Sequence, residues 1–204
     1  MSRTLSRVTT LTTLTAGLVC AGFTLGAAAQ NATSMPSKAK PTTMAASGSM
    51  APMAKNTVPG ADQAFMKKAA IGGMTEVQLG TMAQQKGASD QVKQFGAKMA
   101  QDHGKANDEL KQIASTKGVA LPEALDAKAK QDVAKFGKMT GAGFDKAYMS
   151  HMVEDHKQDI AEFKKESTSG KDDDVKAFAT KTLPTLQEHL QLAQAGNDAV
   201  KKSK

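Results

Sequence analysis

Four long segments of the chain carry apolar residues at intervals alternating between three and four, which places those side chains on one face of an α-helix. We predict helices over residues 62–86, 89–117, 144–166 and 173–196. Asp62 and Ser89 are predicted N-caps, and Gly87 and Gly118 are expected to end the first two helices. A shorter, more polar helix is predicted over 122–138, because Pro122 suits a first helical turn.

This order of elements predicts an all-α protein, a four-helix bundle with one extra short helix between the second and third long helices. The connector leaves room for a crossover, so a ferritin-like topology is expected, with an up-down-up-down bundle as the alternative. Gly141 and Gly143 are expected to break the chain before the third long helix. Pro184 is expected to kink the last helix, because it frees the carbonyl of Thr180.

Residues 1–29 have the features of a secretory signal peptide. Arg3 and Arg7 supply the positive start, a weakly apolar stretch follows, and Ala27–Ala29 predicts cleavage near Gln30. An uncleaved anchor is the alternative, but the apolar run falls short of the ~20 residues that a membrane span needs. Cleavage would remove Cys20, the single cysteine, so the mature chain must fold without disulfides.

Two further segments flank the predicted domain of residues 61–196. Residues 30–60 are rich in Ala, Ser, Thr, Pro and Met and have no apolar period, which predicts a disordered linker. Its methionines are possible Cu(I) ligands, but composition alone explains them. Residues 197–204 are predicted to be a basic tail.

The formal charge of +7 does not indicate a nucleic-acid partner. The excess of basic residues lies near the two ends, and residues 61–200 carry 19 basic against 20 acidic side chains. Such a near-neutral domain lacks the basic surface that nucleic-acid binding requires. The lysines near the ends predict at most weak association with an anionic envelope surface, and no transmembrane segment is expected in the mature chain.

The predicted apolar faces are interrupted by ionisable residues that are typical metal ligands. Each long helix carries one such residue on its apolar face: Glu76, His103, His156 and His189. Carboxylate and neutral imidazole bind Zn, Fe, Mn or Cu, so these four are candidate ligands for a divalent transition metal. The remaining histidine, His151, is expected to face solvent, because it points about 140° away from His156.

An acidic residue precedes each of the three histidines: Asp102, Asp155 and Glu188. An adjacent residue is turned by about 100°, so each acid is expected at the edge of the apolar face. There it would reach the imidazole of a neighbouring helix and fix its tautomer, as the outer carboxylates of metal sites do.

A purely structural hydrogen-bond network among these residues remains the alternative to a metal site. Ala100, Val153 and Leu186 stand where the Glu-x-x-His pairs of di-iron bundles would have glutamate, which disfavours that site. Counting from the helix ends also separates Glu76 and His103 by about 6 Å along the axis, which is loose for one mononuclear site.

Several motifs together resemble the bacterial envelope family named domain of unknown function 4142. They are Phe65 with Glu76-Val-Gln-Leu-Gly80, Asp102-His103, Gly143-Phe144-Asp145 with Tyr148, Val153 with His156, and Leu183-Pro184 with Leu186 and His189-Leu190. They span about residues 61–195. The resemblance implies an exported, ferritin-like helical bundle and no established enzymatic activity.

The functional prediction is an exported, non-enzymatic helical bundle of the bacterial envelope, in the periplasm or at the outer membrane, with a stress-related or interaction role. The alternative is a metal-binding or metal-dependent redox protein that uses the inward Glu and His residues. Hydrolase chemistry has no support, because the chain lacks a Gly-x-Ser-x-Gly elbow and a cysteine after cleavage.

Overall fold

The computed structural model describes residues 56–203, which form five α-helices and no strand, so the predicted all-α class is confirmed. The helices are α1 (Gly60–Lys86), α2 (Asp90–Thr116), α3 (Ala127–Gly137), α4 (Gly141–Ser169) and α5 (Asp173–Lys202). The predicted signal peptide, Cys20 and most of the predicted linker lie outside the described residues. None of the described helices is long and apolar enough to cross a membrane.

Two predicted signals at the ends of α2 are confirmed. The Ser89 hydroxyl accepts a hydrogen bond from the backbone N–H of Val92 at 3.2 Å, which satisfies a free donor of the first turn. At the other end Gly118 has φ +65°, and Val119 donates to the carbonyl of Ala114 at 2.8 Å. This is a Schellman ending, in which glycine adopts the left-handed conformation without a steric cost.

Other predicted boundaries are wrong. The short helix begins at Ala127 rather than Pro122, because the Asp126 side chain accepts from the N–H of Ala129 at 2.8 Å and caps it there. Gly141 begins α4 instead of breaking the chain. The last helix continues to Lys202 rather than ending at residue 196, and Pro184 lies inside it, as predicted.

The predicted linker and tail both contribute to the helical domain. Val58, placed in the linker, is buried in the apolar core, and α1 already begins at Gly60. Residues 197–202, placed in the basic tail, belong to α5, where Val200 is buried. Burial of apolar side chains at each end extends the folded region beyond the predicted limits.

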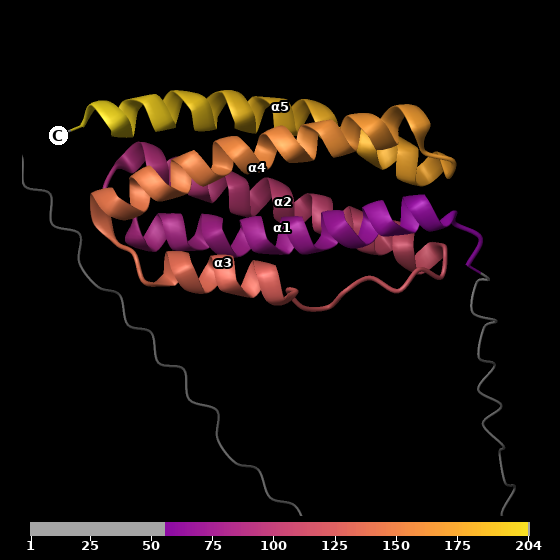
Figure 1. Cartoon of the computed structure of the whole chain (residues 1–204). Helices are drawn as coiled ribbons and strands as arrows, with labels where there is room; N and C mark the ends of the chain where they lie inside the picture. The colour runs from indigo at the N-terminus through magenta and orange to yellow at the C-terminus, as the bar shows by residue number, and fades with distance from the viewer. Residues whose placement is uncertain (1–55, 204) are drawn as a thin grey trace, which may run out of the picture. The chain divides into compact units, whose positions relative to one another are not determined.

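The four long helices form two hairpins, α1 with α2 and α4 with α5 (Figure 1). Each hairpin places a buried aspartate against the turn of the other. Asp62, predicted as an N-cap of its own helix, instead accepts from the N–H groups of Lys171 and Asp172 at 2.8 and 2.6 Å. Asp145 accepts in the same way from Ala88 and Ser89, both at 2.9 Å.

These contacts fix the direction of each helix. Because Asp62 near the start of α1 meets the turn after α4, and Asp145 near the start of α4 meets the turn after α1, these two helices run antiparallel. The Lys117 ammonium binds the Asp172 carboxylate at 2.8 Å, which places the end of α2 beside the start of α5. The connection containing α3 therefore returns along α1 to the opposite end, and α2 and α4 run parallel (Figure 1).

The two hairpins also match in sequence at a constant separation of 83 positions. The pairs include Asp62 with Asp145, Gly87 with Gly170, Ser89 with Asp172, Val92 with Val175, and Phe95 with Phe178. In both turns the glycine N–H donates to the carbonyl four residues earlier. The two hairpins therefore share a sequence pattern around their first helix and turn, and they make equivalent cross-contacts through Asp62 and Asp145.

In the first half of α1 the helical period predicts Phe65, Ala69 and Gly72 on the covered face, but the structure buries other positions. Met66, Ala70 and Gly73 are buried, whereas the neighbouring positions Phe65 and Ala69 are only partly buried. The predicted set lies one position away because α1 contacts α2, α3 and α4, so its covered face is broader than one stripe. Toward its end α1 meets α2 closely, and a Cβ added at Gly96 would lie 2.6 Å from the Gly80 carbonyl oxygen.

Candidate metal centre

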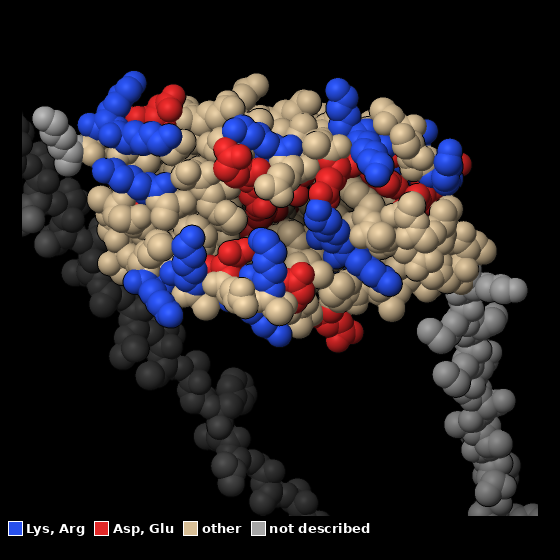
Figure 2. Space-filling view, viewed as in Figure 1, with Lys and Arg blue, Asp and Glu red and all other residues tan. Residues whose placement is uncertain are grey.

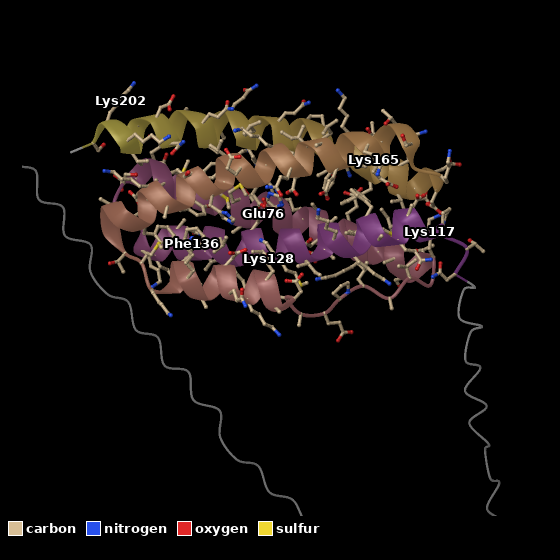
Figure 3. The ribbon with its side chains drawn as sticks, viewed as in Figure 1. Glu76, Lys117, Lys128, Phe136, Lys165 and Lys202 are labelled. Carbon is tan, nitrogen blue, oxygen red and sulfur yellow. The ribbon has the colours of Figure 1, made fainter. Side chains whose placement is uncertain are left out.

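Each of the four long helices contributes one buried ionisable side chain to a layer across the middle of the helical domain. Glu76, His103, His156 and His189 have relative exposures of 1%, 6%, 0% and 0%, so the predicted inward orientation is confirmed. Figure 3 shows Glu76 near the middle of α1. The layer lies between two apolar clusters, one containing Tyr148 and Met149 and the other containing Met66 and Phe178.

The three imidazoles approach one another closely. One ring nitrogen from each of the three histidines lies within 4.8 Å of the others. The His156 Nε2 and His189 Nδ1 atoms are 3.4 Å apart. Glu76 Oε2 is 2.8 Å from His103 Nδ1, so the predicted axial offset between these residues does not separate them.

The second nitrogen of each ring contacts an acceptor outside the histidine cluster. The Nδ1–H of His156 donates to the carbonyl of Met152 at 3.0 Å, and the Nε2–H of His189 donates to Asp102 Oδ2 at 3.1 Å. When Glu76 is ionised it accepts from Nδ1–H of His103, and when it is protonated it donates to the same nitrogen. Metal-binding histidines have this arrangement, since one nitrogen is anchored and the other is left free for the metal.

Burial sets the charge of these groups. It lowers the pKa of His156 to about 3, and the pKa values of His103 and His189 to about 4, so all three rings are neutral at pH 7. Burial, together with the Asp155 carboxylate, raises the pKa of Glu76 well above its usual range. Burial would also raise the pKa of Asp102, but hydrogen bonds from His189 and Lys98 lower it, so Asp102 is ionised.

Of the three acids predicted to support the histidines, the structure brings Asp102 alone to an imidazole among the described residues. Glu188 binds the Lys98 ammonium at 3.1 Å instead, and has no hydrogen bond to a ring. Asp155 lies near Glu76, and its predicted contact with a histidine is not formed. Position at the edge of an apolar face therefore did not determine which neighbour each acid reaches.

Two residues near the centre were missed from sequence. Asp159, one turn after His156, lies with Glu76 and Asp155 in a second group of close carboxylates. The 83-residue repeat is the signal that would have found Asp159, because it occupies the position equivalent to Glu76. Tyr148 is buried, and its hydroxyl has no hydrogen-bond partner within residues 56–203.

The prediction for His151 is also wrong in part. His151 is half-buried rather than exposed, and its ring centroid lies 5.2 Å from that of Phe136. The reason is α3, which covers this side of α4. It still lies apart from the three-histidine cluster, as its position relative to His156 predicts.

A surface pocket of about 380 Å³ between α2 and α5 reaches the cluster. Its lining includes Asp102, His103 and His189, together with Lys98 and Glu188 at its surface. Two of the three histidines therefore line a pocket that opens to solvent on this side.

The protein contains a helical domain of a defined family with no assigned function. The family described as domain of unknown function (DUF4142) matches residues 28–195, and the chain belongs to that family. Searches of curated proteins and of solved structures found no match.

Proposed function

We propose that the protein binds a divalent transition metal through His103, His156 and His189, with Glu76 and Asp102 orienting the outer rings. The observation that carries this proposal is the facing pair of nitrogens, His156 Nε2 and His189 Nδ1. Three imidazoles with a nearby carboxylate suit Zn, Fe, Mn or Cu.

The facing nitrogens favour a cation over a network without metal. A carbonyl and an ionised carboxylate can only accept hydrogen bonds. The single proton of neutral His156 therefore lies on Nδ1, which faces the Met152 carbonyl, and that of His189 lies on Nε2, which faces Asp102. The two remaining lone pairs then lie 3.4 Å apart, and a protonated Glu76 is 3.5 Å from His156 Nε2, too long for a good hydrogen bond. A metal ion would satisfy both nitrogens.

We further propose that the domain is a four-helix bundle of ferritin-like topology. The support is the crossover containing α3, which makes α2 and α4 parallel, as in bundles with one long connection. Export to the periplasm or outer membrane is also proposed, on the signal-like sequence of residues 1–29. The mass of the chain from the cell envelope should start near Gln30, and a form that keeps Met1 or is lipidated at Cys20 would contradict export with this cleavage.

Thermal unfolding of metal-free protein tests the metal proposal. Adding zinc, copper or manganese salts should raise the melting temperature with the logarithm of metal concentration, because the ion binds the folded state alone. The rise should vanish in His156→Ala and in His189→Ala. It should persist in the control His151→Ala, since that ring lies outside the cluster. The proposal fails if no metal shifts the wild-type melt, or if His151→Ala abolishes the shift as well.

A further inference from the structure

Three carboxylates lie beside the histidine cluster, on the side facing α3. One oxygen from each of Glu76, Asp155 and Asp159 lies within 4.8 Å of the others. The three come from two helices: Glu76 from α1, and Asp155 and Asp159 from successive turns of one face of α4. Like charges this close repel, so a metal-free group of three carboxylates is unfavourable without protons or a cation.

Part of this group lacks a hydrogen-bond partner among the residues that the structure describes. Glu76 is 1% exposed, and its Oε2 is used by His103. Its Oε1 has no hydrogen-bond partner among the described residues, since His156 Nε2 lies 3.5 Å away, too far for a good hydrogen bond. Asp155 is half-buried, and no hydrogen bond or ion pair engages it among the described residues. A buried acceptor left without a donor costs free energy, and a cation is the partner that serves several acceptors at once.

The surroundings give a cation a route to this position. A surface pocket of about 260 Å³ between α1, α3 and α4 is lined by four aspartates, including Asp155 and Asp159. Its two lysines already pair with other acids, Lys128 with Asp132 at 2.9 Å and Lys68 with Glu162. Figure 2 shows acidic side chains at the middle of this face, surrounded by lysines.

We propose that Glu76, Asp155 and Asp159 form a second cation site, which takes a hard divalent ion such as Mn²⁺ or Mg²⁺ next to the metal held by the histidines. Oxygen-only ligands prefer these ions, whereas imidazoles prefer Zn²⁺ or Cu²⁺, so the two positions differ in selectivity. Glu76 belongs to both, since one oxygen holds His103 and the other makes no hydrogen bond to a described residue, which leaves its lone pairs for the second ion. The inference rests on the proposed function through this shared residue.

The test uses the whole chain, stripped of metal and loaded with one equivalent of zinc. Calorimetric titration with Mn²⁺, with the electron paramagnetic resonance of free Mn²⁺ as a second readout, should give one further bound ion per chain. Asp155→Asn and Asp159→Asn should each lower Mn²⁺ affinity by tenfold or more and leave zinc affinity within about threefold. Asp132→Asn is the matched control, because Asp132 lines the same pocket but pairs with Lys128. Its Mn²⁺ affinity should equal that of the wild type.

The outcomes separate the two proposals. The second site is refuted if zinc-loaded wild type binds no Mn²⁺, or if both asparagine variants bind it as tightly as Asp132→Asn does. The histidine site is refuted independently if zinc affinity is unchanged in His189→Ala. Circular dichroism of each variant before loading checks that the helices are intact, and the two asparagine variants test the same position separately.

Discussion

Asp102 offers the sharpest test of how the histidine centre is organised. Its ionised carboxylate accepts from His189 Nε2–H at 3.1 Å and from Lys98 at 3.2 Å. This contact keeps the proton on Nε2 and leaves Nδ1 free to face His156. In Asp102→Asn the amide can donate to Nε2, which favours the tautomer with its proton on Nδ1, the nitrogen that must bind the metal.

The expected loss follows from the role of the contact. Removing the group that orients a metal-binding histidine typically costs 10–100-fold in metal affinity, or about 1.4–2.8 kcal/mol. Glu188→Gln is the matched control, because Glu188 binds the same Lys98 at 3.1 Å but contacts no histidine. An exposed ion pair contributes about 0–1 kcal/mol, so this variant should lose less than about fivefold.

Zinc affinity measured by competition with a chromophoric chelator distinguishes the two variants. Asp102→Asn should bind zinc at least tenfold more weakly than the wild type, whereas Glu188→Gln should stay within about fivefold of the wild type. Both variants should keep the helical circular dichroism of the wild type. Equal zinc affinity in the two variants would refute the assignment of Asp102 as the group that fixes the His189 tautomer.

Three further predictions concern stability. In α2, Gly96→Ala should lower the free energy of unfolding by about 1–3 kcal/mol, because the added methyl group overpacks the contact with α1. Gly104→Ala has open space at its Cβ, so it should be neutral or stabilise by up to about 1 kcal/mol. Equal free energies of unfolding for the two variants in urea would contradict this. Asp145→Asn should lower the free energy of unfolding in urea by about 1–3 kcal/mol, because the backbone N–H of either Ala88 or Ser89 loses its acceptor. An unchanged free energy of unfolding would contradict the contact between Asp145 and this turn. The lowered pKa of His156 removes stability from the metal-free protein as pH falls from about 6.5 toward 3, because the unfolded chain binds a proton that the buried ring does not. The raised pKa of Glu76 acts in the opposite direction, so the test is the difference between variants. Between pH 7 and 5 the urea midpoint should drop more, or rise less, in the wild type than in His156→Gln, and equal slopes would refute the lowered pKa.

The sequence determined the elements that depend on local chemistry. Ser89 and Gly118 end α2 as predicted, because a hydroxyl cap and a left-handed glycine act on their own backbone. The burial of Glu76 and the three histidines was also predictable, since each replaces an apolar residue at helical spacing. The spacing of apolar residues along one helix is enough to predict which of its faces is buried.

The tertiary structure decided which groups meet. Asp62 has the sequence features of an N-cap, yet it binds the turn before α5, because the crossover brings that turn to the start of α1. Asp102, Asp155 and Glu188 share one local pattern, yet they contact an imidazole, a carboxylate group and a lysine respectively. Periodicity gives the direction of a side chain around its own helix, whereas its partner depends on the order, direction and axial shift of the helices packed against it.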